Sequence, residues 1–199
     1  MQAQNTYVLN HDQVSDLIAA VGKTDTVIIR GHMGTGKTMS VERLPERPEF
    51  ANHKVITVSC PNLDVGDVMI PMPNRERGCV EMLPNELFAP ACEEPCIIVL
   101  DEFDRAKVPG PVIKALLPIV YDRRVGVKDF HPDTVVVGTR NLQDEGVGAD
   151  LEAHESNRVI EVELRKPGNM EWVTWGISNG IHPALLGWVR DDAPVGGDD

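Results

Sequence analysis

The sequence lacks the features that would mark a membrane-embedded or secreted protein. It has no run of about 18 apolar residues, so we expect no transmembrane helix. The opening segment, Met1-Gln2-Ala3-Gln4-Asn5, has neither a basic start nor an apolar block, so we expect no signal peptide. A cytoplasmic location with reduced thiols follows as the expectation.

Residues that bind transition metals are few and badly spaced. The cysteines are Cys60, Cys79, Cys92 and Cys96, and none of them forms a Cys-x-x-Cys pair. Ligand-like spacing is also missing around His11, His53, His131, His154 and His182. Structural zinc needs closely spaced pairs of such ligands, so no zinc site is expected.

Positive charge is in short supply as well. The chain has 19 Lys and Arg residues against 31 Asp and Glu residues, which gives a formal net charge of −12. A surface devoted to nucleic acid needs lysines and arginines to neutralise phosphates, so the composition argues against one. A local basic groove, or a basic pore in an assembly, stays open.

What the sequence does contain is an alternation of short apolar strands and helical patterns. Strands are predicted at 26–30, 54–60, 96–101, 134–139 and 158–164, and helices at 12–21, 37–44 and 111–121. Continuous apolar runs indicate strands that are buried on both sides. The pattern predicts an α/β fold with a five-stranded parallel sheet and helices on both faces. Residues 74–82 suit a hairpin, and a helix is expected to open after Pro84.

The segment after the first predicted strand is a phosphate-binding motif. It reads Gly31-His32-Met33-Gly34-Thr35-Gly36-Lys37-Thr38 and fits G-x-x-x-x-G-K-[ST] at every fixed position. Glycines let the backbone curl so that its N–H groups face phosphate oxygens. Lys37 is predicted to reach the β- and γ-phosphates, and the Thr38 hydroxyl to ligate magnesium. The motif therefore predicts a P-loop protein that binds ATP with Mg²⁺.

Polar residues at the ends of other strands complete the predicted site. Asp101 ends the strand 96–101 and is predicted to hold the magnesium shell, while Glu102 is predicted to act as general base on an attacking water. Asn141 follows the strand 134–139 and is a candidate to hold that water or the γ-phosphate. Arg158 is a candidate to neutralise charge on the γ-phosphate of a neighbouring subunit.

These motifs together resemble the AAA+ ATPases, and within them the MoxR and dynein-related branch. Asp101-Glu102-Phe103-Asp104-Arg105-Ala106 is similar to the Asp-Glu-Ile-Asn-Arg-Ala signature of that branch, and Gly138-Thr139-Arg140-Asn141 is similar to its Ala-Thr-Gln-Asn sensor strand. Leu151 to Arg158 resembles the segment before the family's Arg-Phe, although Val159 stands in place of the Phe.

The resemblance also implies a domain plan. Residues 1–166 would form the P-loop ATPase core, residues 167–190 a helical lid, and residues 191–199 an acidic tail. The lid is expected to be incomplete, because only two short helices, 169–179 and 183–190, are predicted after Pro167.

The resemblance further implies a working form. ATP would lie between the subunits of a ring, often a hexamer, and hydrolysis to ADP and phosphate would remodel a protein client, such as one that carries a von Willebrand factor A domain. The alternatives are a motor that acts on nucleic acid, as in the McrB-like and loader branches, and a nucleotide-binding assembly module that does not hydrolyse ATP. A small-molecule kinase fits less well, because no second substrate lid is apparent.

Overall fold

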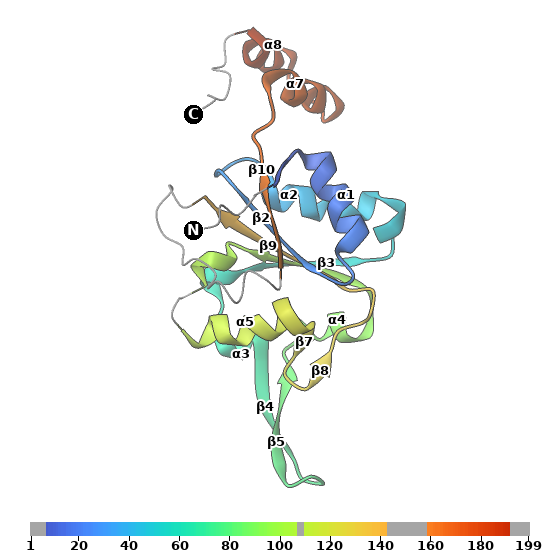
Figure 1. The fold of residues 1–199 in the computed structure, drawn as a ribbon, viewed down its shortest axis with the longest axis vertical. Helices are drawn as coiled ribbons and strands as arrows, with labels where there is room; N and C mark the ends of the chain where they lie inside the picture. The colour runs from blue at the N-terminus through green and yellow to red at the C-terminus, as the bar shows by residue number, and fades with distance from the viewer. Residues whose placement is uncertain (1–6, 107–109, 143–158, 192–199) are drawn as a thin grey trace. The chain divides into compact units, whose positions relative to one another are not determined.

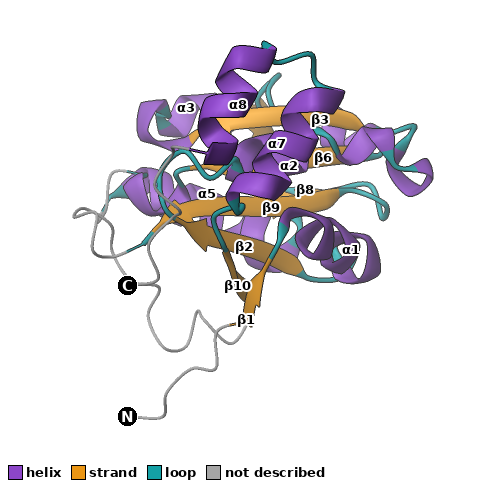
Figure 2. Cartoon of the chain, turned by 90° about the horizontal axis from the view of Figure 1, so that it is seen from above, coloured by secondary structure: helices purple, strands orange, loops and turns teal. Residues whose placement is uncertain are grey.

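A six-stranded parallel sheet forms the centre of the fold. The computed structural model describes residues 7–106, 110–142 and 159–191. In order across the sheet, the strands are β1 (Tyr7–Leu9), β10 (Val159–Leu164), β2 (Thr26–Gly31), β9 (Val135–Asn141), β6 (Cys96–Asp101) and β3 (Lys54–Ser59) (Figure 2). The predicted parallel sheet is confirmed, with one additional strand, β1, at its edge.

Helices cover both faces of this sheet, as predicted (Figure 1). One face is covered by α1 (His11–Val21) and α2 (Lys37–Glu42), and the other by α3 (Val65–Val68), α4 (Pro90–Glu93) and α5 (Pro111–Asp122). Alternate residues of a strand serve opposite faces: Ile97 packs with the α1 side and Ile98 with the α5 side. Burial on both faces explains why these strands are continuous apolar runs.

The connections contain short elements that the periodicity did not predict in detail. Among the residues that the structure describes, there are four single turns of 3₁₀ helix: η1 (Leu44–Glu46), η2 (Pro48–Phe50), η3 (Cys60–Asn62) and η4 (Phe103–Arg105). The helix expected directly after Pro84 begins only at Pro90, because the intervening residues form turns in which Phe88 and Ala89 both donate to the Asn85 carbonyl.

Besides the central sheet, the described residues form two antiparallel hairpins. The strands β4 (Met69–Asn74) and β5 (Cys79–Pro84) form a hairpin that extends away from the sheet, past the layer of α5 (Figure 1). A much smaller hairpin joins β7 (Arg124–Val125) to β8 (Lys128–Asp129). A hairpin was expected around residues 74–82, and the structure confirms it with longer strands.

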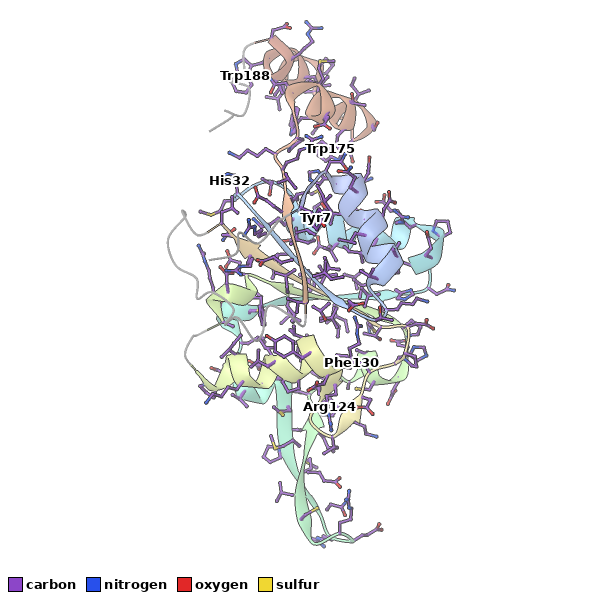
Figure 3. All side chains as sticks on the ribbon, viewed as in Figure 1. Tyr7, His32, Arg124, Phe130, Trp175 and Trp188 are labelled. Atoms are coloured by element: carbon purple, nitrogen blue, oxygen red, sulfur yellow. The ribbon has the colours of Figure 1, made fainter. Side chains whose placement is uncertain are left out.

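The chain divides into two compact units, Met1–Leu164 and Arg165–Asp199. In the second unit, α7 (Asn169–Ser178) packs on α8 (Pro183–Asp191), with Val173 and Leu186 buried between them. Trp175 comes from α7 and Trp188 from α8 (Figure 3). Within the described part of the chain, every helix is too short or too polar to span a membrane.

Candidate nucleotide-binding site

The predicted phosphate-binding loop joins the end of β2 to the start of α2. Residues 31–38 span this connection, and His32 marks the point where the chain leaves β2 (Figure 3). In the sheet, β2 lies between β10 and β9, and β6 lies on the other side of β9. Because these strands are parallel, their carboxyl ends lie at one edge of the sheet, which is where α/β proteins place their ligands.

The loop curls sharply because two of its glycines adopt a left-handed backbone. Gly34 has φ of 74° and Gly36 has φ of 85°, values that an L side chain rarely takes. The Thr35 hydroxyl closes the curl by donating to the His32 carbonyl at 2.9 Å. Thr35 is buried, whereas Met33 and Gly34 are exposed, so the outer turn of the loop faces solvent.

Lys37 points its ammonium group back into the curl. Its Nζ donates to the carbonyls of Gly31 and His32, both at 2.8 Å, and to Oδ1 of Asn141 at 3.0 Å. The contact with Asn141 joins the loop to the end of β9. A lysine and an amide that meet here present a positive charge and N–H donors at one point, as recognition of a terminal phosphate requires.

Asp101 accepts hydrogen bonds from two hydroxyl groups at the tip of β6. Its Oδ1 lies 2.7 Å from Oγ1 of Thr38 and 2.6 Å from Oγ1 of Thr139. Mg²⁺ prefers oxygen ligands, and it usually takes one or two protein groups together with the phosphates of a nucleotide. The Thr38 hydroxyl and the Asp101 carboxylate therefore fit magnesium. No larger cluster of three or more His, Cys, Asp or Glu side chains suited to a metal occurs among the described residues.

Glu102 has an unusual backbone. Its φ of 50° and ψ of 46° lie in the left-handed region, which costs a glutamate free energy and is concentrated at functional sites in proteins. The Glu102 N–H donates to the Thr139 hydroxyl at 3.1 Å, so β9 supports the turn. Its carboxylate pairs with the Arg105 guanidinium at 3.2 Å, across the single turn of η4.

Negative charge is concentrated behind this strand tip. Burial, together with the nearby carboxylates of Asp101 and Asp104, raises the pKa of the Cys60 thiol to about 12. Burial also raises the pKa of Asp104, although the Arg140 charge opposes the shift. A cation bound at the tip would offset this local charge.

The structure brings together most of the residues that the sequence singled out. The loop, Asp101, Glu102 and Asn141 meet at one edge of the sheet through side-chain hydrogen bonds and strand pairing. Arg158 lies outside the described residues, so its role stays a prediction. Sequence reasoning assigned no role to the side chains of Thr139 and Arg105. The sequence could have indicated a role for both, because each lies within a motif that carries the family resemblance.

Comparisons with known proteins agree with this geometry. Residues 26–153 match the AAA domain of the dynein-related subfamily. A search of curated proteins returned no match.

Several solved structures share the fold. A candidate ATPase from Cytophaga hutchinsonii is 19% identical with a TM-score of 0.58, over 84% of this chain and 50% of that one. A RuvB mutant from Thermotoga maritima is 18% identical with a TM-score of 0.54, over 83% and 50%. Hsp104 bound to ATPγS and casein is 16% identical with a TM-score of 0.60, over 86% and 36%.

The chain thus spans half or less of the length of these structures, and at such identities they show the fold alone. The family match is broader, because it covers more than half of the chain and contains the loop and the two strand tips described above. The chain therefore belongs to the AAA domain family, in its dynein-related subfamily.

Proposed function

We propose that this protein is an AAA+ ATPase of MoxR type, which hydrolyses ATP to ADP and phosphate in order to remodel a protein partner. The observation that carries the proposal is the meeting of loop and strand tips: Thr38 bonds to Asp101 at 2.7 Å, and Lys37 bonds to Asn141 at 3.0 Å. Each contact joins a residue that binds phosphate or magnesium in P-loop proteins to a residue at the end of a neighbouring strand.

Each side chain has a chemical task in this proposal. The amides of the loop bind the phosphates, and Lys37 holds the negative charge of the terminal phosphate. Bound magnesium, held by Thr38 and Asp101, would supply further neutralisation of that charge. Asn141 orients the attacking water, and Glu102 accepts its proton as the water oxygen bonds to the γ-phosphorus and the bond to the ADP oxygen breaks.

Water is the favoured acceptor because a carboxylate stands next to the metal-binding position. Glu102 is held on a strained turn that η4 and Thr139 support, and its carboxylate is restrained by the ion pair with Arg105. A protein client is favoured over nucleic acid because the net charge is −12. A ring of subunits, in which Arg158 contacts the nucleotide of a neighbour, and a client with a von Willebrand factor A domain belong to the same proposal.

Release of phosphate tests the hydrolase assignment. We expect turnover by the wild type with Mg²⁺-ATP and a loss of about 100-fold or more in Glu102→Gln, because a general base contributes about that factor. Glu102→Gln should still bind nucleotide, whereas Lys37→Ala should lose affinity for it.

Glu94→Gln is the matched control. Glu94 lies just before β6, at the opposite end of the strand from Glu102, and its exposed carboxylate pairs with Lys54 at 3.8 Å. We expect wild-type turnover from this variant. Equal phosphate release by the wild type and Glu102→Gln would refute the hydrolase assignment and favour a nucleotide-binding assembly module.

A further inference from the structure

A histidine from outside the P-loop motif contacts the loop backbone. His11 is the first residue of α1, and its Nε2 lies 2.8 Å from the carbonyl oxygen of Thr35. A carbonyl oxygen can only accept, so Nε2 carries the hydrogen and donates it. The ring also lies against Gly36, where a Cβ atom would stand 3.2 Å from Nε2. The imidazole thus braces the peptide between Thr35 and Gly36.

The fold holds His11 in this place through the start of α1. Asn10 caps the helix by accepting from the Gln13 N–H at 2.8 Å, and the Gln13 side chain accepts from the Asn10 N–H at 3.0 Å. The preceding strand β1 ends at Leu9, which pairs with Leu164 of β10. The loop starts beside the same residue, since a Cβ on Gly31 would lie 2.8 Å from the Leu164 carbonyl. Leu164 therefore sets the positions of both partners.

The hydrogen bond between His11 and Thr35 also orients the N–H of Gly36. In a trans peptide the carbonyl and the following N–H point in opposite directions. With the Thr35 carbonyl held toward His11, the Gly36 N–H points away from His11. Glycine imposes little restraint of its own on this peptide, because Gly36 can adopt positive or negative φ with ease. The hydrogen bond from His11 supplies an external restraint on its orientation.

We propose that His11 is a positioning residue of the nucleotide site, which holds the Thr35–Gly36 peptide so that the Gly36 amide faces the phosphates. The inference rests on the proposed function, because it takes the ligand of the loop to be a nucleotide. A donor that is oriented before the ligand arrives lowers the cost of ordering the loop on binding. His11 touches no reacting atom and acts through the backbone alone.

Nucleotide affinity of the full chain tests this role. His11→Met keeps an apolar side chain of similar length but has no donor, and we expect its Kd for Mg²⁺-ADP to rise about three- to ten-fold, as loss of one hydrogen bond predicts. His11→Gln offers an N–H donor near the position of Nε2, and we expect its Kd to return to within about two-fold of the wild type. Isothermal titration calorimetry measures all of these constants.

Ala20→Gly separates positioning from simple helix stability. Ala20 is an exposed residue near the other end of α1, and glycine weakens the helix without altering its cap or Thr35, so we expect a lower Tm and an unchanged Kd. Wild-type affinity in His11→Met would overturn the inference. An equal loss of affinity in Ala20→Gly would also overturn it, because the effect would then come from α1 as a whole.

A measurement without nucleotide keeps the two proposals apart. In the ligand-free protein, the ¹⁵N chemical shift of the Gly36 amide responds to the hydrogen bond on the preceding carbonyl far more than to loss of the ring. It should move in His11→Met and stay near the wild-type position in His11→Gln. An unmoved Gly36 amide in His11→Met would overturn the role of His11. A wild type that binds no nucleotide, but whose Gly36 amide responds in this way, would instead refute the proposed function.

Discussion

At the scale of single residues, Arg123 makes an extensive set of contacts outside the site. Its guanidinium donates to four carbonyls, those of Gly22, Thr24, Asp25 and Thr134, at 2.7 to 3.4 Å. These groups lie in the turn between α1 and β2 and just before β9, and burial lowers the pKa of Arg123. The side chain therefore ties two sheet connections to the end of α5.

Removal of this guanidinium should destabilise the protein strongly. We expect Arg123→Met to lower the free energy of unfolding by about 2–4 kcal/mol, because several partly buried carbonyls lose a charged donor at once. Urea unfolding followed by circular dichroism measures the change. The control is Arg124→Met, since Arg124 is exposed and donates to Gly126 at 3.2 Å. That variant should stay within about 0.5 kcal/mol of the wild type, and similar losses in both would contradict the argument.

At this scale, a sequence can predict the roles of side chains that belong to a known motif. Lys37, Thr38 and Asp101 have fixed roles because the spacing of the motif sets the backbone that presents them. His11 was not assigned a role, because its contact depends on how the chain folds. His11 reaches Thr35 across 24 positions of sequence, and no local pattern predicts such a contact.

At the scale of elements, Gly126 joins the two hairpins. It forms the turn of the β7–β8 hairpin with φ of 56°, and an added Cβ would lie 1.9 Å from the Met82 carbonyl oxygen of β5. The next residue, Val127, donates its N–H to that same oxygen at 2.9 Å. The small hairpin is thus held directly against the base of the large one.

Substitution of Gly126 should separate these hairpins. We expect Gly126→Ala to lower the free energy of unfolding by about 2–4 kcal/mol, since the backbone clash adds to the cost of a left-handed alanine. Gly78→Ala is a matched control, because Gly78 has φ of 63° but no atom within 4 Å of its added Cβ. The control should cost only about 1 kcal/mol, which is the conformational part alone. Equal unfolding midpoints in thermal melts of the two variants would rule out the clash.

Length explains which elements could be predicted. The strands β2, β6 and β9 have six or seven residues of mostly apolar sequence, and their runs were recognised with small errors at the ends. The strand β1 has three residues and β7 and β8 have two each, which is too short for a periodicity to register. Proline usually interrupts a helix, yet α5 continues through Pro118 to Asp122. Packing against the sheet sustains that last turn, where Ile119 and Val120 are buried.

At the scale of the whole molecule, the four cysteines of the first unit differ in their exposure to solvent. Cys79 is exposed on β5, Cys92 is half-buried, and Cys60 and Cys96 are buried in the core under the α5 face. Burial raises the pKa of Cys60 to about 12 and that of Cys96 to about 11, and it also raises the pKa of Cys92. Because the thiolate is the reactive form, a raised pKa lowers reactivity at any pH below it.

Thiol labelling should therefore proceed in two steps. With a disulfide reagent at pH 8, we expect Cys79 to react at once, whereas Cys60 and Cys96 have only about one thiolate in a thousand or fewer and lie out of reach. These two should react only as the first unit unfolds, so their labelling and the loss of helical signal should share one urea midpoint. Cys79→Ser removes the fast step, and a further Cys92→Ser substitution removes the half-buried thiol, so that only the two buried thiols remain. Rapid labelling of Cys60 in this folded double variant would mean that the core beneath the acidic strand tip opens without global unfolding.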